Sequence, residues 1–126
     1  MVRKVWLDTN FLMIPVQFRV DIFEELHRLL NEPFELLIAS GTLDELKFIS
    51  GGRGEDAGAA RIGLKLIEGK GVKVVQSSGN VDDWLVERAV ERDFVCTNDI
   101  GLIRRLRETK VRRIQLKGKT HLDFAY

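Results

Sequence analysis

The sequence predicts a three-layer α/β/α domain with a central, mainly parallel sheet of five strands. Short apolar runs alternate along the chain with longer segments in which apolar residues recur at helical spacing. Strands that alternate with helices form parallel βαβ units with right-handed crossovers. The chain has 126 residues, 44% of them hydrophobic and 31% charged, which suffices for one hydrophobic core. Since no linker or internal repeat interrupts it, we expect residues 1–126 to form a single domain.

Each predicted strand is a short apolar run bounded by polar or turn-forming residues. The first contains Val5, Trp6 and Leu7 and is followed directly by an aspartate. The fourth contains the single cysteine, Cys96, which we interpret as a buried structural thiol. The five predicted strands cover residues 3–8, 35–39, 72–75, 94–97 and 111–116.

The predicted helices are the segments in which apolar residues recur every three or four positions. In residues 21–30, for example, Ile22, Phe23 and Leu26 have this spacing. The glycine-rich segment 51–54 separates the second helix from the third and predicts a flexible loop over the site. The other four predicted helices cover residues 42–49, 57–67, 82–91 and 100–107.

Four carboxylates follow the predicted strands. Asp8 ends the first strand, Glu45 lies just past the second, Asp82 follows the third and Asp99 follows the fourth. Ligands of open α/β sheets bind outside the carboxyl ends of the strands, so these acids are expected to gather at one edge. They would repel one another unless a cation lay among them, and Mg²⁺ takes oxygen ligands while keeping several waters. The pattern therefore predicts a metal-dependent enzyme that acts on phosphate esters.

Two of these acids also have a structural interpretation, which the residues leave open. Thr42 and Glu45 have the spacing of a capping box, in which the glutamate reaches back to the first amide of a helix. Asp99 opens a predicted helix, where an acid suits the helix dipole.

The paired aspartates Asp82 and Asp83 begin the fourth predicted helix, and helical spacing separates their faces. Asp82 shares a face with Leu85 and Ala89, whereas Asp83 lies beside Glu87 on the solvent side. We therefore expect Asp82 to face the site and Asp83 to have at most a supporting role.

Positive charge is concentrated at the end of the chain, although the net charge is only +1. A basic stripe beside an acidic site suits a nuclease, because the cations bind phosphates. A solvated helix face and a charge-protected edge strand would give the same pattern. The stripe comprises Arg104, Arg105, Arg107, Lys110, Arg112, Arg113, Lys117 and Lys119.

The remaining composition indicates a cytoplasmic protein without membrane contact. No apolar run approaches the roughly 20 residues of a membrane span, and the first strand begins too early for a signal peptide. One cysteine cannot form an internal disulfide, which fits a reducing compartment.

Four motifs in order resemble the PIN domain, a metal-dependent ribonuclease fold. They are LDTN at the start, an acid after the second strand, VDDWLVERA, and TND. The resemblance implies an endoribonuclease whose acidic quartet falls on Asp8, Glu45, Asp82 and Asp99. Of these, Asp8, Asp82 and Asp99 would bind one or two Mg²⁺ or Mn²⁺ ions that activate water. The supporting polar residues it implies are Thr9, in the turn after strand one, Asn10 and Asn98, which orient water or phosphate, and Thr97.

Two branches of this family share these motifs. LDTNF, the QFRVD segment, the paired aspartates and the basic run with Arg104, Arg105 and Arg107 resemble PIN proteins that process small-subunit ribosomal RNA. The other branch consists of ribonuclease toxins that pair with antitoxins. The implied partners are RNA and either a pre-ribosomal protein or an antitoxin. A homodimer through the face that carries Phe23 and Leu26 and a catalytically silent scaffold that binds RNA or protein are further interpretations.

Two other enzyme or signalling classes begin with an aspartate after the first strand. A haloacid-dehalogenase-type phosphatase needs a second aspartate at the position of Asn10. A response-regulator receiver needs an aspartate where Gln76 follows the third strand. The histidines, His27 and His121, fit solvated surface positions better than catalysis. Metal-dependent ribonuclease is therefore the predicted function.

Overall fold

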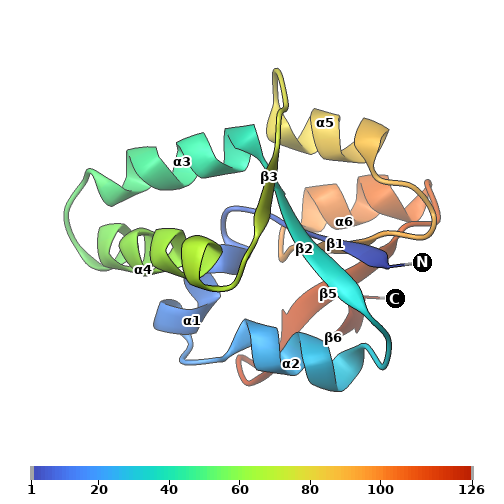
Figure 1. The fold of residues 1–126 in the computed structure, drawn as a ribbon, viewed down its shortest axis with the longest axis horizontal. Helices are drawn as coiled ribbons and strands as arrows, with labels where there is room; N and C mark the ends of the chain where they lie inside the picture. The colour runs from blue at the N-terminus through green and yellow to red at the C-terminus, as the bar shows by residue number, and fades with distance from the viewer. Residues whose placement is uncertain (1, 126) are drawn as a thin grey trace.

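The computed structural model describes residues 2–125 and contains one six-stranded sheet in the order β3-β2-β1-β4-β5-β6 (Figure 1). β1 lies near the centre, between β2 and β4, and pairs in parallel with both. The predicted α/β class with a mainly parallel sheet is confirmed. The strands are β1 (Arg3–Leu7), β2 (Phe34–Ala39), β3 (Lys73–Val75), β4 (Phe94–Cys96), β5 (Arg112–Lys117) and β6 (His121–Ala125).

The sixth strand corrects the expected count of five, which left the residues after 116 in a tail. β6 pairs with β5 in antiparallel register, from Lys117 opposite His121 to Arg113 opposite Ala125. Gly118 and Lys119 turn the chain between the two strands, both with a left-handed backbone. Polar residues alternate with Leu122 and Phe124 in β6, so this edge strand lacks the continuous apolar run that marks the interior strands. Met1 and Tyr126, included in the expected domain, lie outside the described residues.

All five predicted helices are present, with ends shifted by a few residues. The segment around Pro15, which connects β1 to the first of them, is also helical, and a proline in the first helical turn is compatible with this. No helix within residues 2–125 is both long and apolar enough to cross a membrane. The helical elements are η1 (Phe11–Met13), α1 (Ile14–Gln17), α2 (Ile22–Leu29), α3 (Ser40–Ser50), α4 (Glu55–Gly69), α5 (Val81–Arg88) and α6 (Ile100–Arg107).

The alternation of side chains along the strands creates two hydrophobic layers. In β1, Val5 and Leu7 face the core beneath α1, α2, α3 and α4, whereas Trp6 faces the core beneath α5 and α6. Both faces of the central strands are covered, which explains their continuous apolar sequence. Figure 1 shows α5 and α6 on one side of the sheet and α1 and α2 on the other, with α3 and α4 side by side.

Helix α4 packs closely on the segment that follows β1. A Cβ built on Gly63 would lie 2.9 Å from the backbone oxygen of Leu12, closer than real Cβ contacts come. The absence of a side chain at Gly63 therefore brings α4 against η1. Gly58 lies in the same helix, but a Cβ there would meet nothing within 4 Å.

We predict that Gly63→Ala lowers the free energy of unfolding by about 1–3 kcal/mol, because Leu12 contributes rigid backbone that yields poorly to overpacking. Gly58→Ala is the matched control and should raise it by roughly 0.5–1 kcal/mol, since alanine is the better helix former. Urea denaturation of both variants checks the difference. Equal effects of the two substitutions would contradict the close approach of α4 to η1.

Candidate active site

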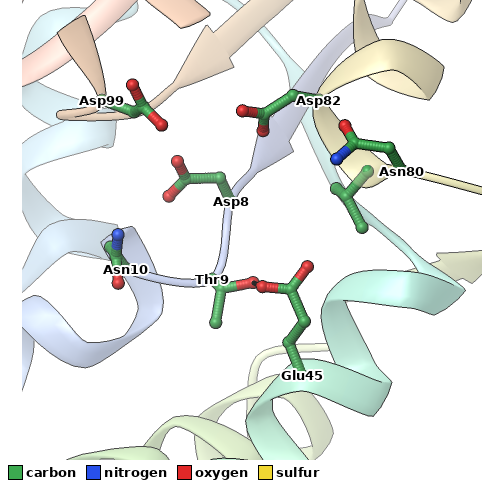
Figure 2. A pocket seen from close by; sticks show the side chains of 8 residues that line it. Asp8, Thr9, Asn10, Glu45, Asn80, Asp82 and Asp99 are labelled. Carbon is green, nitrogen blue, oxygen red and sulfur yellow. Dashed lines mark hydrogen bonds between the residues drawn. The ribbon is translucent and has the colours of Figure 1, made fainter. Parts of the chain in front are cut away.

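A polar cavity of about 220 Å³ opens at the carboxyl edge of the sheet (Figure 2). All four acids of the expected quartet line it, although they come from four separate parts of the chain. The lining residues are Asp8, Thr9, Asn10, Glu45, Asn80, Val81, Asp82 and Asp99.

Asp8 lies at the centre of this cavity, directly after β1, and is only 7% exposed. The backbone amide of Phe11 donates to its Oδ1 at 2.9 Å, and the hydroxyl of Thr97 donates to its Oδ2. These two donors orient the carboxylate between the ends of β1 and β4. Asp8 is thus held in place by the fold before any ligand binds.

Thr97 also connects Asp8 to Asp99. Its Oγ1 accepts a hydrogen bond from the backbone amide of Asp99 at 3.0 Å. Asp99 Oδ1 accepts in turn from the amides of Gly101 at 2.8 Å and Leu102 at 3.3 Å, which caps α6. Asp99 therefore caps a helix with one oxygen, and its carboxylate also faces Asp8 in the cavity (Figure 2).

Glu45 reaches the cavity without forming the capping box that its spacing with Thr42 allowed. Helix α3 begins at Ser40, three residues earlier than that motif requires, and Thr42 is buried inside the helix. The carboxylate of Glu45 instead accepts a hydrogen bond at 3.0 Å from the hydroxyl of Thr9. Thr9 thereby orients a cavity acid, which goes beyond the turn-supporting role expected of it.

The first turn of α3 is satisfied by a side chain from a distant loop. Ser77 Oγ accepts from the amide of Gly41 at 2.9 Å, and Ser40 Oγ accepts from the amide of Ser77 at the same distance. A Cβ on Gly41 would lie 2.6 Å from Cγ2 of Val81, so α3 closely approaches the start of α5. This contact brings Glu45 and the loop before Asp82 to the same cavity.

The paired aspartates separate as their helical spacing predicts. Asp82 lines the cavity and is partly buried. The side chain of Asp83 is 64% exposed and forms an ion pair with Arg105 at 2.8 Å. Arg105 lies on α6, so this ion pair joins the two helices that flank the cavity.

Asn80 is a cavity residue that the sequence analysis missed. Its Oδ1 caps α5 by accepting from the amide of Asp83 at 3.0 Å, so its amide nitrogen faces the cavity (Figure 2). An asparagine before an acid-rich helix start is a strong N-cap signal, which could have identified its position.

The other supporting asparagines differ from one another. Asn10 lines the cavity as expected. Asn98 does not line it, because its Oδ1 accepts from the backbone amide of Leu116 at 2.8 Å and joins the end of β4 to β5. Asn98 therefore has a structural contact outside the cavity, and its role in orienting water or phosphate stays a prediction.

The electrostatics of the cavity favour a cation. The pKa of Asp8 is raised to about 6, mainly by burial. The charges of Asp82 and Asp99 contribute to this rise, and the hydrogen bonds from Thr97 and Phe11 oppose it. Burial and the charge of Asp99 also raise the pKa of Asp82, although Arg105 opposes this. The repulsion expected among the acids contributes to both of these pKa shifts. The structure shows that burial is the larger cause.

The residues present fit an ion that keeps part of its water shell. Within residues 2–125, no three Asp, Glu, His or Cys side chains are arranged closely enough to enclose a metal. The cavity instead offers carboxylate oxygens around an open centre. Mg²⁺ binds through one or two carboxylates while it keeps several waters, and Mn²⁺ also favours such oxygen donors. The donor set therefore suits a hydrated Mg²⁺ or Mn²⁺.

Comparison with known proteins gives concordant matches. The sequence matches the family described as PIN like domain over residues 5–119. Ribonuclease VapC4 of Methanocaldococcus jannaschii is 29% identical over 126 residues, with 95% of this chain and 95% of that protein covered. The PIN domain endonuclease Utp24 is similar in fold, with a TM-score of 0.80 over 96% of this chain and 90% of that chain and 23% sequence identity.

The raised pKa of Asp8 predicts how the stability of the metal-free protein depends on pH. The folded-state pKa of about 6 exceeds the usual 3.8, so the folded state binds the proton more tightly than the unfolded state. The free energy of unfolding should therefore fall as the pH rises from about 4 to 6, and the loss should persist above that. Asp8→Asn removes this penalty and should stabilise the protein near pH 8 by up to about 3 kcal/mol, with no gain near pH 4.

Urea denaturation in EDTA at both pH values measures this effect. Asp83→Asn is the matched control, because that carboxylate is exposed and paired with Arg105. A parent protein as stable as Asp8→Asn near pH 8 would contradict the burial cost.

Proposed function

This chain belongs to the family of PIN-like domains, and on that premise we propose that it is a metal-dependent endoribonuclease that hydrolyses RNA phosphodiester bonds. The observation that carries the proposal is the convergence of Asp8, Glu45, Asp82 and Asp99 on one cavity at the carboxyl edge of the sheet. Helix capping accounts for Asp99, and the helix dipole favours Asp82. Neither explains Asp8 or Glu45, and the burial of Asp8 makes the shared charge unfavourable without a cation.

Asp8, Asp82 and Asp99 would hold the hydrated ion, in part through its water molecules, because they are the cavity acids whose charges act on one another. When bound, a divalent cation supplies Lewis acidity toward the phosphoryl oxygens and lowers the pKa of water, so that water can lose a proton and attack near neutral pH. The hydrogen bonds from Phe11 and Thr97 keep Asp8 in position. Hydrolysis would join the water oxygen to phosphorus and break the bond from phosphorus to one ribose oxygen, which takes up a proton from solvent.

The remaining cavity residues would act on the attacking water and the phosphate. Glu45 uses one oxygen to accept from Thr9, which leaves the other to orient the water and to accept its proton. The side-chain amides of Asn10 and Asn80 lie at the same cavity and can donate hydrogen bonds to the phosphate oxygens. These donors would stabilise the negative charge that builds up on the phosphate during attack.

Pre-ribosomal RNA is the target class we propose, with a pre-ribosomal protein as partner. The support comes from the LDTNF, QFRVD and paired-aspartate features, which resemble the ribosomal-RNA-processing branch of the family. Resemblance to the toxin branch keeps a toxin-type ribonuclease with an antitoxin as the alternative.

The paired aspartates give a test with an internal control. With Mn²⁺ or Mg²⁺, the parent should cleave RNA, and EDTA should abolish cleavage. We predict that Asp82→Asn lowers the cleavage rate by at least about 10- to 100-fold, the loss typical even for residues that only support a metal ligand. Asp83→Asn should retain most of the activity, since that carboxylate pairs with Arg105 outside the cavity. Salt-sensitive binding without cleavage by the parent would instead identify a silent scaffold.

The basic stripe gives a second test of RNA as the substrate. Arg104, Arg105 and Arg107 lie on α6, the helix that Asp99 caps, and all three are exposed. Their simultaneous replacement by Ala should weaken the binding of many RNA sequences alike. It should also reduce the salt dependence by roughly 0.7 log–log units for each phosphate that the variant no longer binds.

The matched control removes equal charge elsewhere: Lys65, Lys70 and Lys73 are exposed and lie in or after α4 and at the start of β3. Filter binding at several salt concentrations compares the two triple variants. If both bind RNA equally well, α6 does not contact the nucleic acid and its arginines form a solvated face.

A further inference from the structure

Phe48 is the large hydrophobic residue that is most exposed in the described chain, at 86%. It lies on α3, and the buried residues of that helix, Thr42 and Leu46, face the protein. The ring thus contributes little to the core, and an exposed aromatic side chain gains free energy when a ligand removes it from water. The residues around Phe48 indicate which kind of ligand would cover the ring.

The ring adjoins the acidic cavity through a shared residue. Phe48 lines a shallow, largely apolar hollow together with Asp44, Glu45 and Ile49, and Glu45 also lines the cavity that contains Asp8. Glu45 and Phe48 are three residues apart on one helix, a rise of about 4.5 Å. A chain that leaves the cavity past Glu45 therefore meets the Phe48 ring almost at once.

We propose that Phe48 stacks on an unpaired base of the RNA next to the scissile phosphate and thereby selects single-stranded substrates. This inference rests on the proposed ribonuclease function. Phe48 becomes a specificity-determining residue that contacts the substrate without taking part in the chemistry.

The charges around the ring favour a base over the other parts of an RNA. Asp44 and Glu45 are acidic and adjoin the same hollow, so they would repel a phosphate there. A nucleobase is uncharged and presents an aromatic face, and proteins commonly bind unpaired bases by stacking them on aromatic rings. Stacking on a side chain needs a base that is free of its duplex neighbours, which gives the preference for single strands.

Three substitutions of Phe48 separate stacking from simple hydrophobic contact. The probe is a short single-stranded RNA that contains 2-aminopurine, and a fully paired duplex of the same sequence is the comparison. Binding is measured in EDTA, and cleavage with Mn²⁺. Phe48→Ala and Phe48→Leu should each weaken single-strand binding by at least roughly fivefold relative to the parent. Phe48→Trp should bind as tightly as the parent, because its side chain is also an aromatic ring that can stack on a base.

The cleavage data should show the same residue acting on binding alone. We expect Phe48→Ala to raise KM while kcat at saturating RNA changes little, and to affect the duplex less than the single strand. Phe18→Ala is the matched control, because this phenylalanine is also exposed and lines neither hollow. Stacking should change the fluorescence of 2-aminopurine with the parent and the Phe48→Trp variant but not with Phe48→Ala.

Three outcomes would overturn the proposal in distinguishable ways. If the parent cleaves RNA and Phe48→Ala binds and cleaves as well as the parent, Phe48 does not contact the substrate although the proposed function stands. The same holds if Phe48→Leu matches the parent and Phe48→Ala changes only the oligomeric state, which would assign the ring to a protein contact. If the parent neither binds nor cleaves RNA, the proposed function fails and the role of Phe48 with it.

Discussion

The site depends on how one buried negative charge is held. Asp8 ends the central strand, and its carboxylate is enclosed by the fold with hydrogen bonds from Thr97 and from the amide of Phe11. Thr97 is bound to the amide of Asp99, which caps α6, so the ends of β1, β4 and α6 are joined through one hydroxyl group. A carboxylate positioned this way is unfavourable for folding and favourable for binding a cation. Sites of this kind commonly lower stability for the sake of function.

The helix N-termini around the cavity reduce the cost of placing several carboxylates close together. Asp99 caps α6, and Asp82 lies in the first turn of α5, where the amide groups and the helix dipole favour negative charge. Asp8 gains a comparable amide donor from the start of η1. The fold therefore surrounds its acids with partial positive charge from the backbone. Among residues 2–125, no cationic side chain lines the cavity, which leaves its centre open to an ion.

Local patterns predicted most of the cavity, and contacts between distant residues explain the rest. Asp8, Asp82 and Asp99 follow strands or begin helices, and such positions can be recognised along the chain. The sequence allowed a capping box with Glu45 because the residue that in fact accepts from an amide at the start of α3, Ser77, is far away in sequence. Asn98 likewise bonds to Leu116, a pairing that depends on how β5 lies beside β4. The missed strand β6 depends on β5 in the same way, because an edge strand with alternating polar residues has a weak signal of its own.

The reciprocal bonds between Ser40, Gly41 and Ser77 have a consequence for how the cavity can move. They tie the start of α3 to the loop that leads into α5, and the bare backbone of Gly41 lets the two segments touch. Glu45 and Asp82 are therefore carried by one rigid corner and lose the freedom to move apart. Opening the cavity between this corner and the Asp8–Asp99 side would break the Thr9–Glu45 hydrogen bond and the Asp83–Arg105 ion pair. The two sides of the cavity are therefore connected to each other as well.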